Sequence, residues 1–555
     1  MRSPAPSDVN AGQQAPAATP VRRRVRAAGW FLVVSLVFGT AYTMRPLYSS
    51  NQNHHFLKGL ADAGVGFLSD DWQVQSVDPF PVFSRIVAFT HRHLSDNFFY
   101  LCYYLLFGAY VLATLRVGAT GMPVDRSPTE RLVVFSLFTW LHSEVFGYLF
   151  LFDKAHIGWW QMTHWGVAGQ EIFGHGAFQA SSFGMLLPLA VLLFLGGRPI
   201  VATVLAAVVV DLHFSYALTS GSLVAAFVIL TGWPSRDWRR AARMAVLAAA
   251  IVAPALLYTL GNFGPSSPEV SAQAFRILSE HLPFEAIPTS WFDAKSLAQL
   301  GLVMVAIVLV RRTPLLLVVG IPTAIGVALT GVQMLTGSQA LGLIFPWRTS
   351  VLALPLSTAV IVSRGVGWLF ERWRLDRGTA RRALVAGSVV SLVLGVTSGV
   401  VRMTAEFALF YDDRPIERIV ARVAPAGVLA DFVQELRPDG VPLLTFVERT
   451  RAKGDVYLIP PDLQRFRSHT GAPAFVDHKS HPYKDVEVLE WDRRLRLAQR
   501  FYAGRNDCTV LGQITRQYHI THVVVDRQVS RTVCAGLAPL FVDDSYGVYQ
   551  VLPAR

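Results

Sequence analysis

The chain has 555 residues, of which 52% are hydrophobic and only 16% are charged, and its mean hydropathy is +0.38. Water-soluble globular proteins carry about 25% charged residues, so the composition excludes a purely soluble enzyme and a disordered protein. The composition, with its recurring apolar runs, likewise excludes a disulfide scaffold. The three cysteines have no CxxC spacing, which excludes a cysteine-based zinc module. Of the net charge of +12, +11 arises in the hydrophobic first 402 residues, where basic side chains report membrane topology rather than a nucleic-acid partner.

The first 26 residues are expected to form a disordered, basic cytoplasmic leader. They are rich in Ala, Pro, Ser and Gln, and four arginines then precede an apolar run from Ala28 to Met44. A signal peptide also places a basic region before an apolar one. This run is long, however, and no small-residue cleavage site follows it. We therefore predict an uncleaved first membrane helix that starts on the inside.

Apolar runs of about 20 residues recur along residues 27–402, and each is long enough to cross a bilayer. They predict a membrane all-α domain of about 11 transmembrane helices. These lie near residues 28–44, 97–115, 131–152, 178–197, 199–214, 217–233, 241–261, 297–310, 314–335, 344–362 and 383–402. Arg and Lys concentrate in the segments that this topology places inside. We expect a multi-pass protein of the bacterial inner (cytoplasmic) membrane, with its C-terminal region outside.

The first outside loop, residues 45–96, carries three aspartates close together: Asp70, Asp71 and Asp78. Apolar spacings near residues 56–60 and 82–89 predict amphipathic helices along the membrane surface. Carboxylates there suit either general-base activation of an acceptor hydroxyl or the binding of a divalent metal, Mg or Mn. Each aspartate could instead cap a helix or a turn. Both interpretations stay open, and the metal is the one cofactor that the sequence suggests.

Other outside side chains suit ligand binding. Arg348, at the start of the tenth predicted helix, and Arg276 are candidates for a phosphate group, because the planar guanidinium makes bidentate bonds to phosphate. Glu171 and His175 would share one face if their segment is helical, and both side-chain types ligate metals. The outer histidines have scattered spacings and form no HExxH motif, so most are expected to be hydrogen-bonding groups. The metal ligands stay unassigned.

Residues 403–555 have the composition of a soluble domain. Short apolar stretches predict buried strands at residues 457–459, 474–476 and 522–525, and helices are expected at 416–436 and 487–502. Alternating strands and helices predict a small extracytoplasmic α/β domain. Cys508 and Cys534 both belong to this domain, and an oxidising compartment would let them form a disulfide.

This plan resembles the GT-C superfamily of integral-membrane glycosyltransferases. The resemblance lies in an inside-starting first helix, a long first outside loop with Ser69-Asp70-Asp71-Trp72, many membrane helices and an outside C-terminal domain. It implies a polyprenyl-phosphate-linked sugar as donor and a catalytic role for Asp71 or Asp70. Asp78 is the third candidate, because the Pro79 that follows it is typical of a turn. The segment from Phe475 to Ser480 is similar to a domain of uncharacterised bacterial multi-pass membrane proteins. The WWD motif of oligosaccharyltransferases is absent.

The leading hypothesis is therefore a membrane glycosyltransferase that transfers a sugar to an extracytoplasmic glycan, lipid or protein. Its expected partners are membrane lipid, the lipid-linked sugar and that acceptor, with no nucleic acid. Two alternatives stay open. Glu144 and Asp211 fall inside predicted helices, and intramembrane carboxylates often serve transport, so a transporter or flippase of a lipid or glycan is one. A non-catalytic envelope assembly factor is the other.

The predicted topology can be tested with reporter fusions. A phosphatase fused after residue 555 should be active, because the C-terminal domain is expected outside, while a fluorescent protein fused at the N-terminus should fluoresce inside. A C-terminal fusion that is active only in the cytoplasm would contradict the topology.

Overall fold

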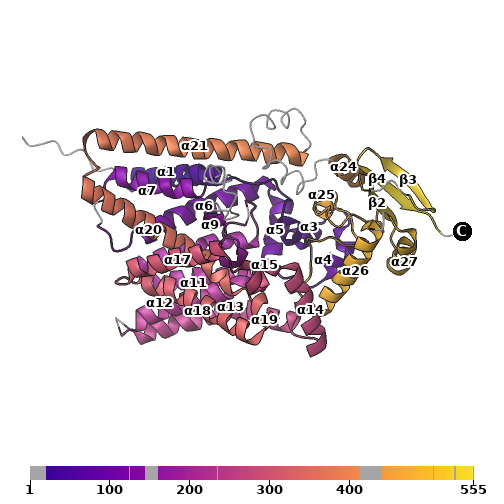
Figure 1. Cartoon of the computed structure of the whole chain (residues 1–555), viewed down its shortest axis with the longest axis horizontal. Coiled ribbons are helices and arrows are strands. Elements are labelled where there is room, and N and C mark those ends of the chain that lie inside the picture. Colours follow the sequence, from indigo (N-terminus) through magenta and orange to yellow (C-terminus); the bar gives the residue numbers. More distant parts are fainter. Residues whose placement is uncertain are drawn as a thin grey trace, which may run out of the picture.

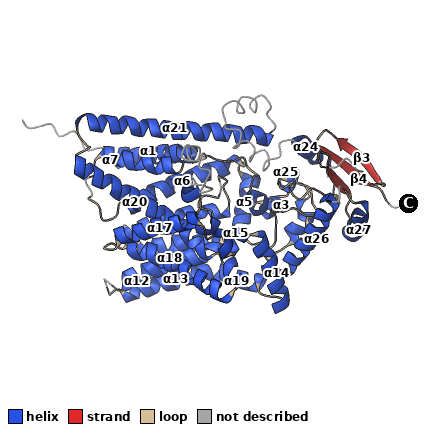
Figure 2. Cartoon of the chain, viewed as in Figure 1, coloured by secondary structure: helices blue, strands red, loops and turns tan. Residues whose placement is uncertain are grey.

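The protein is mostly helical and carries a small sheet domain at one end (Figures 1 and 2). The computed structural model describes residues 20–123, 126–143, 161–174, 176–233, 236–411, 440–503, 506–529 and 533–553. The expected leader lies largely outside this part of the chain. Helix α1 (Pro20–Tyr42) already begins inside the stretch assigned to the leader.

Seven segments of the described chain are helical, long and apolar enough to cross a membrane. They are Arg24–Tyr42 in α1, Asn97–Gly118 (α6), Phe214–Gly232, Trp238–Phe263 (α13), Leu315–Thr336 (α18), Gln339–Trp373 and Gly378–Tyr411 (α21). Three more of the predicted runs are shorter apolar helices, Ala180–Leu195, Pro199–Leu212 (α11) and Ala294–Val310 (α17). The run near 131–152 begins in α7 (Pro128–Leu141) and continues outside the described residues. The chain is thus a multi-pass membrane protein by length and composition, and the count of 11 stays a prediction.

Several of these segments are built from two or three consecutive elements. Phe214–Gly232 contains η4 (Phe214–Tyr216) and α12 (Ala217–Gly232), and Ala180–Leu195 contains η3 (Ala180–Leu186) and α10 (Leu187–Leu195). Gln339–Trp373 contains α19 (Gln339–Leu343), η5 (Pro346–Thr349) and α20 (Ser350–Trp373). Two of the short elements, η4 and η5, carry polar side chains of the site described below.

The first loop folds into short helices that pack on one another. These are α2 (Gln52–His55), α3 (Leu57–Ala63), η1 (Leu68–Asp70), α4 (Trp72–Gln75) and α5 (Pro81–His93). Helix α5 is amphipathic, as expected, and buries Phe83 and Val87. Gly59 lets α3 pack closely against α5, because a Cβ at this position would lie 2.6 Å from the Ser84 carbonyl oxygen of α5.

A second group of short helices connects the membrane segments on the same side. It consists of α9 (Gln161–His164), η2 (Val167–Gly169), α14 (Pro268–His281), α15 (Pro283–Ala286) and α16 (Pro288–Trp291). Helix α14 packs against the C-terminal domain. The loop-like stretch after residue 262 therefore contains helices that reach that domain.

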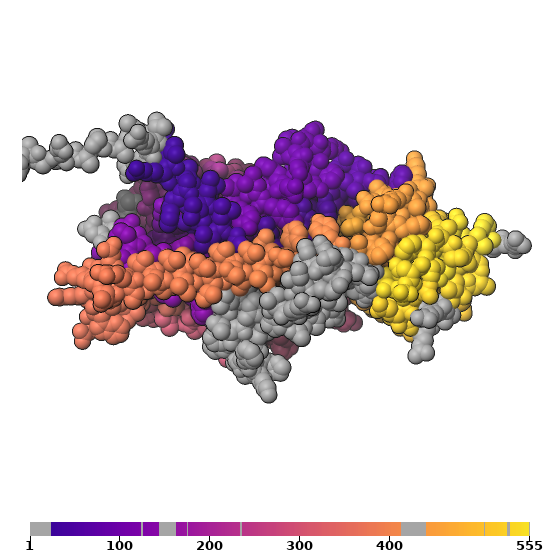
Figure 3. Space-filling view, turned by 90° about the horizontal axis from the view of Figure 1, so that it is seen from above, coloured from indigo at the N-terminus to yellow at the C-terminus, as the bar shows by residue number. Residues whose placement is uncertain are grey.

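The domain boundary expected between residues 402 and 403 is wrong, because α21 continues through it to Tyr411. Glu406 is buried there, accepts a hydrogen bond from Arg402 Nε at 3.0 Å and pairs with Arg45 at 3.8 Å. Figure 3 shows α21 in orange along one face of the molecule. The helix expected at 416–436 lies outside the described residues.

The C-terminal domain is an α/β domain with a four-stranded sheet in the order β1-β2-β4-β3. Strand β1 (Tyr457–Leu458) is parallel to β2 (His522–Asp526), and β4 (Tyr546–Val551) is antiparallel to β2 and to β3 (Leu537–Val542). Residues 474–476, expected as a strand, contribute only an isolated bridge from Ala474 to Tyr457. The helices are α24 (Val441–Thr450), α25 (Phe466–Thr470), α26 (Asp485–Ala503) and α27 (Cys508–Tyr518).

Alternation along β2 divides the domain core into two layers. Val523 and Val525 pack with residues of α26 and α27, whereas Val524 packs with residues of α24 and α25. Successive side chains of a strand point to opposite faces of the sheet. Helices therefore cover both faces, which explains why β2 is apolar at consecutive positions.

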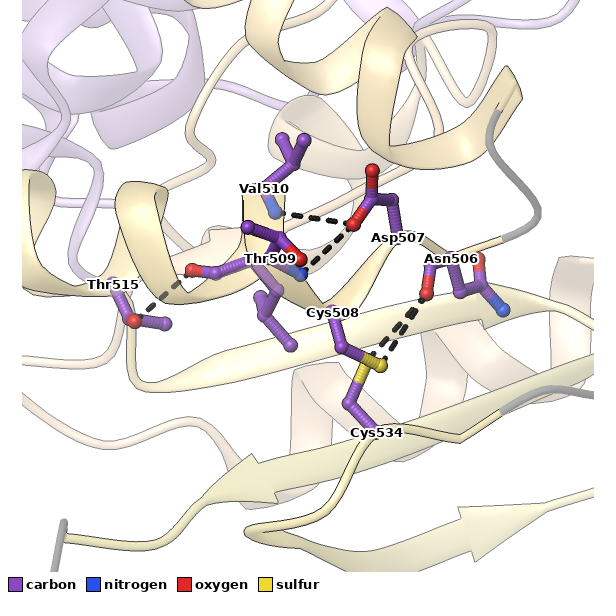
Figure 4. Close-up of a disulfide and its surroundings, with 8 residues drawn as sticks. Asn506, Asp507, Cys508, Thr509, Val510, Thr515 and Cys534 are labelled. Carbon is purple, nitrogen blue, oxygen red and sulfur yellow. Dashed lines mark hydrogen bonds between the residues drawn. A yellow bond between two sulfur atoms is a disulfide. The ribbon is translucent and has the colours of Figure 1, made fainter.

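Cys508 and Cys534 form the expected disulfide, which joins the start of α27 to the segment before β3 (Figure 4). Asp507 caps α27 by accepting from the backbone N–H groups of Thr509 and Val510. The bridge fastens α27 to the outer part of the sheet. The third cysteine, Cys102, is free and half-buried in α6.

Candidate active site

A buried ion pair joins the first loop to the C-terminal domain. Arg467 of α25 is 1% exposed, and its Nε donates to Asp71 Oδ2 at 2.7 Å. Its Nη1 donates to Asp477 and its Nη2 donates to the Ala474 carbonyl oxygen at 2.7 Å. We call Asp71, Arg467 and Asp477 the Arg467 junction. Every nitrogen of this guanidinium has a partner, as a buried charge requires.

The junction gives Asp71 a structural role. Beyond Arg467, its carboxylate accepts from the backbone N–H of Ala474 at 2.8 Å and from that of Gln73 at 2.8 Å, which caps α4. The carboxylate thus accepts three hydrogen bonds from fixed protein donors, and Asp71 is only 1% exposed, so no substrate hydroxyl reaches it. The geometry therefore does not support Asp71 as the general base. Asp70 lies exposed at the end of η1.

Further contacts fasten the same two parts together. The Trp72 indole donates to the Phe475 carbonyl oxygen at 2.6 Å, and Ser468 Oγ donates to Asn53. The Val77 N–H donates to Glu487 of α26 at 3.0 Å. The first loop and the C-terminal domain thus form one packed unit. Side chains at the interface between them are held in place by both parts.

A set of polar side chains meets beside this interface and forms what we call the central polar site. Its members come from α2, the segment after η2, α15, η5 and the loop after Asp477. They are His54, His55, Glu171, Glu285, Arg348, Lys479, His481 and Tyr483. Segments of the helical bundle, the first loop and the C-terminal domain all contribute.

Arg348 is held on three sides by its surroundings. Its Nε donates to Ser215 Oγ at 3.1 Å, its Nη1 to the Glu171 carbonyl oxygen at 3.4 Å, and its guanidinium lies over the Tyr216 ring at 5.3 Å. Within the described chain, Nη2 has no hydrogen-bond partner. The turn at Phe345, with φ of +52°, starts η5 and directs the chain into this position. Arg348 therefore offers one fixed donor edge to a ligand.

Glu171 belongs to the site but is already hydrogen-bonded. Its Oε1 accepts from Asn51 Nδ2 at 2.7 Å and its Oε2 from Gln179 Nε2 at 2.5 Å. It lies in an isolated bridge with Trp165 and not in a helix, so the helical face expected with His175 is wrong at Glu171. His175 itself lies outside the described residues. Glu171 serves as a fixed negative charge beside Arg348.

Glu285 is the carboxylate without a hydrogen-bond or ion-pair partner among the described residues near the site. It lies in the short helix α15 and is half-buried. Burial raises its pKa to about 7, the charges of Arg348 and Lys479 lower it, and that of Glu171 raises it. A carboxylate with a pKa near neutrality can accept a proton at physiological pH and release it again.

Lys479 supplies a second cation. Its backbone N–H and that of Ser480 donate to Asp477 Oδ1 at 2.7 and 2.6 Å, so the Arg467 junction shapes the loop that carries it. The lysine charge acts on His54, His55 and Glu285. Its Nζ makes no hydrogen bond or ion pair within the part of the chain that the structure describes. The same holds for the hydroxyl of Tyr483.

The site disfavours the charged form of its histidines. Burial lowers the pKa of His54, His55 and His481 well below the usual range, and neighbouring positive charges add to this. His54 and His481 stack with ring centroids 5.3 Å apart. His54 Nε2, His55 Nδ1 and both His481 ring nitrogens are buried without hydrogen-bond partners. In the described ranges, no three His, Cys, Asp or Glu side chains converge to hold a metal ion.

Asp78 lines a small neighbouring cavity, of about 10 Å³, together with His54, His55, Lys58, Ser84 and His481. Its Oδ1 accepts a hydrogen bond from the Phe80 N–H at 2.8 Å, which forms a local turn around Pro79. Burial raises the pKa of Asp78. It therefore lies at the edge of the central polar site. Arg276, by contrast, is exposed on α14 and makes no contact with the site.

Sequence reasoning named Arg348 and Glu171, which the structure brings together, but it missed Glu285, Lys479 and Tyr483. One signal for Lys479 was present. The chain has six lysines among 50 basic residues, and two of the six, Lys58 and Lys479, lie beside the buried histidines. A lysine in a chain that otherwise uses arginine marks a position worth examining.

Comparison with known proteins gives one partial match. Residues 438–498 match a domain of unknown function, DUF6798. No curated protein matches the chain. The matched stretch contains Arg467 and Asp477 of the junction and Lys479, His481 and Tyr483 of the site. It covers too little of the chain to assign a family to the whole protein.

Replacing Arg467 by Gln should destabilise the protein strongly, because Asp71 and Asp477 would remain buried without a counter-charge. Breaking a buried ion pair on one side costs about 3–5 kcal/mol, which a thermal unfolding scan in detergent would register as a lower midpoint. Arg496→Gln is the matched control, since Arg496 is 66% exposed in its pair with Asp492 and such pairs contribute below about 1 kcal/mol. Equal midpoints for the two variants would contradict the junction.

Stability should also fall with pH below about 6.5. The folded-state pKa of each site histidine is lower than its unfolded value of about 6.5, so the unfolded state binds more protons and acid favours unfolding. Each histidine contributes at most about 1.4 kcal/mol per pH unit. Glu285, whose pKa is raised to about 7, acts with the opposite sign between about 4.5 and 7 and offsets one of them. Thermal unfolding midpoints measured at pH 7.5 and 5.0 test this prediction. The fall in midpoint between the two pH values should be smaller in His481→Gln than in the wild type. An equal fall in both proteins would refute the role of His481.

Proposed function

We propose that this protein is a membrane glycosyltransferase that moves a sugar from a polyprenyl-phosphate donor to an acceptor hydroxyl. One observation carries the proposal. Arg348 and Lys479, each with a donor group that has no partner in the described chain, share a half-buried site with Glu285, an unpaired carboxylate whose pKa is raised to about 7. Cations for a phosphate and a base for a hydroxyl are what this reaction needs.

The two cations suit the phosphate of the donor. Arg348 is fixed by Ser215, Tyr216 and the Glu171 carbonyl oxygen, so it loses little freedom when it binds. Lys479 adds a positive charge from the C-terminal domain. Hydrogen bonds between ionised groups are about twice as strong as neutral ones. These interactions strengthen as the leaving phosphate gains charge, which favours bond cleavage.

Glu285 is the proposed general base. In the reaction the acceptor oxygen forms a bond to the anomeric carbon while the bond from that carbon to the phosphate oxygen breaks. The acceptor proton passes to Glu285, and polyprenyl phosphate leaves with the electron pair of the broken bond. A single displacement of this kind inverts the anomeric configuration. Catalysis by a positioned base contributes about 10²–10⁴-fold to the rate.

The surroundings suit a lipid-linked donor. Phe284, next to Glu285, is 67% exposed, and Phe89 on the amphipathic helix α5 is 58% exposed. Exposed Phe side chains on surface helices are typical of helices that lie in the membrane interface. A prenyl chain could thus remain in the membrane while its phosphate reaches Arg348. The expected side of this site is extracytoplasmic.

The structure offers less for the transporter alternative. Glu144 lies outside the described residues. Asp211 on α11 makes no hydrogen bond or ion pair within the described chain, and the nearby His213 bonds to Ser215 at 2.6 Å. The unpaired cations and the unpaired base lie together at the ends of the membrane helices. That arrangement favours chemistry on a lipid phosphate.

Glu285→Gln should lower the turnover of a polyprenyl-phosphate-linked hexose by about 10²–10⁴-fold, because Gln keeps the shape but accepts no proton. Arg348→Ala and Lys479→Ala should each weaken donor binding by about 1.5–3 kcal/mol. Release of polyprenyl phosphate in membranes that contain the natural acceptors measures both effects. Glu280→Gln and Arg276→Ala, on exposed positions of α14, are matched controls. Wild-type turnover with unimpaired Glu285→Gln would contradict the base, and no turnover of any such donor would contradict the function.

A further inference from the structure

A groove in the helical bundle, separate from the central polar site, has no part in the proposed reaction. It lies between α1, α6 and α7 and has a volume of about 580 Å³. Its walls are apolar and include Trp30, Val34, Leu112, Leu115 and Phe135. Val34 is 1% exposed, so the groove reaches the interior of the bundle, while Trp30 on its rim is 57% exposed.

The groove lies at the end of the bundle opposite the C-terminal domain. Helix α6 starts near the first loop at Asn97 and ends at Gly118, and the groove surrounds this far end of α6 and the start of α7. The three helices run side by side in Figure 1. The groove therefore opens toward the other leaflet from the one that the central polar site faces.

Arginines line one end of this groove. Arg116 of α6 is exposed and forms no hydrogen bond or ion pair within the described chain. Arg131 of α7 is exposed and donates only to the Arg126 carbonyl oxygen, at 2.8 and 3.1 Å. Arg126 is different, because Glu130 neutralises it at 2.6 Å. Among the described residues, two guanidinium charges beside an apolar cleft thus have no carboxylate partner.

We propose that this groove binds one anionic phospholipid. An acyl chain fits along Leu112, Leu115 and Phe135, and the phosphate lies between Arg116 and Arg131. A zwitterionic lipid carries its own cation, which the arginines repel, so charge complementarity selects an anionic head group. Snorkelling alone, in which basic side chains reach past apolar surface to water, would give no preference for one lipid over another.

Lipid binding to the purified protein in detergent tests this proposal. Native mass spectrometry and thermal scans would compare dioleoyl-phosphatidylglycerol, dioleoyl-phosphatidylcholine and free glycerol 3-phosphate. Each arginine near a membrane surface strengthens binding of anionic lipid by about 5-fold. Arg116→Gln with Arg131→Gln should therefore weaken phosphatidylglycerol binding by roughly 25-fold. Phosphatidylcholine and glycerol 3-phosphate should bind much more weakly to the wild type.

Arg311→Gln with Arg312→Gln is the matched control. These two arginines are exposed after α17, at the same end of the bundle, where Thr313 lies against Gly121, but they do not line the groove. They should leave lipid binding unchanged. Leu112→Trp, which fills the groove without changing charge, should reduce bound phosphatidylglycerol if the double variant does not fold. Equal losses in both double variants, equal binding of both lipids, or an equal response to glycerol 3-phosphate would overturn the proposal.

Discussion

The arrangement of this protein depends on one buried guanidinium. Arg467 bonds to Asp71 of the first loop and to Asp477 of its own domain, and all three side chains are almost completely inaccessible. Burying three charges is costly unless each is paired and hydrogen-bonded. The backbone groups of Gln73, Ala474, Lys479 and Ser480 complete that pairing. The junction therefore fixes where the C-terminal domain sits on the membrane bundle.

The central polar site follows from this placement. The membrane-associated part supplies Glu171, Glu285 and Arg348, and the C-terminal domain supplies Lys479, His481 and Tyr483. Neither part holds both cations. The stretch that matches a domain of unknown function thus contributes side chains to a site formed with the bundle, and in our proposal it completes the phosphate-binding group. A role restricted to recruiting partners would not require its loop to face Glu285.

The sequence was sufficient for features that depend on local pattern. Apolar runs gave the membrane segments, spacing gave the amphipathic α5, and cysteine position gave the disulfide. The site was only partly predictable. Asp71 was expected to be catalytic, whereas the structure pairs it with Arg467. The two residues are 396 positions apart in the sequence, and no local pattern reports such a contact. Glu285 lies in a four-residue helix, too short to show a periodic pattern, and its pKa is raised by burial that only the fold creates.

A structure of the wild-type protein with a polyprenyl monophosphate in nanodiscs would test the central claim most directly. The phosphate is expected between Arg348 Nη2 and Lys479 Nζ. The prenyl chain should pass Phe284 into the membrane. The Glu285 carboxylate should face the space beside the phosphate that the sugar and the acceptor would occupy. Density for the phosphate at another place on the protein, with Arg348 and Lys479 unchanged and unliganded at saturating lipid, would contradict it.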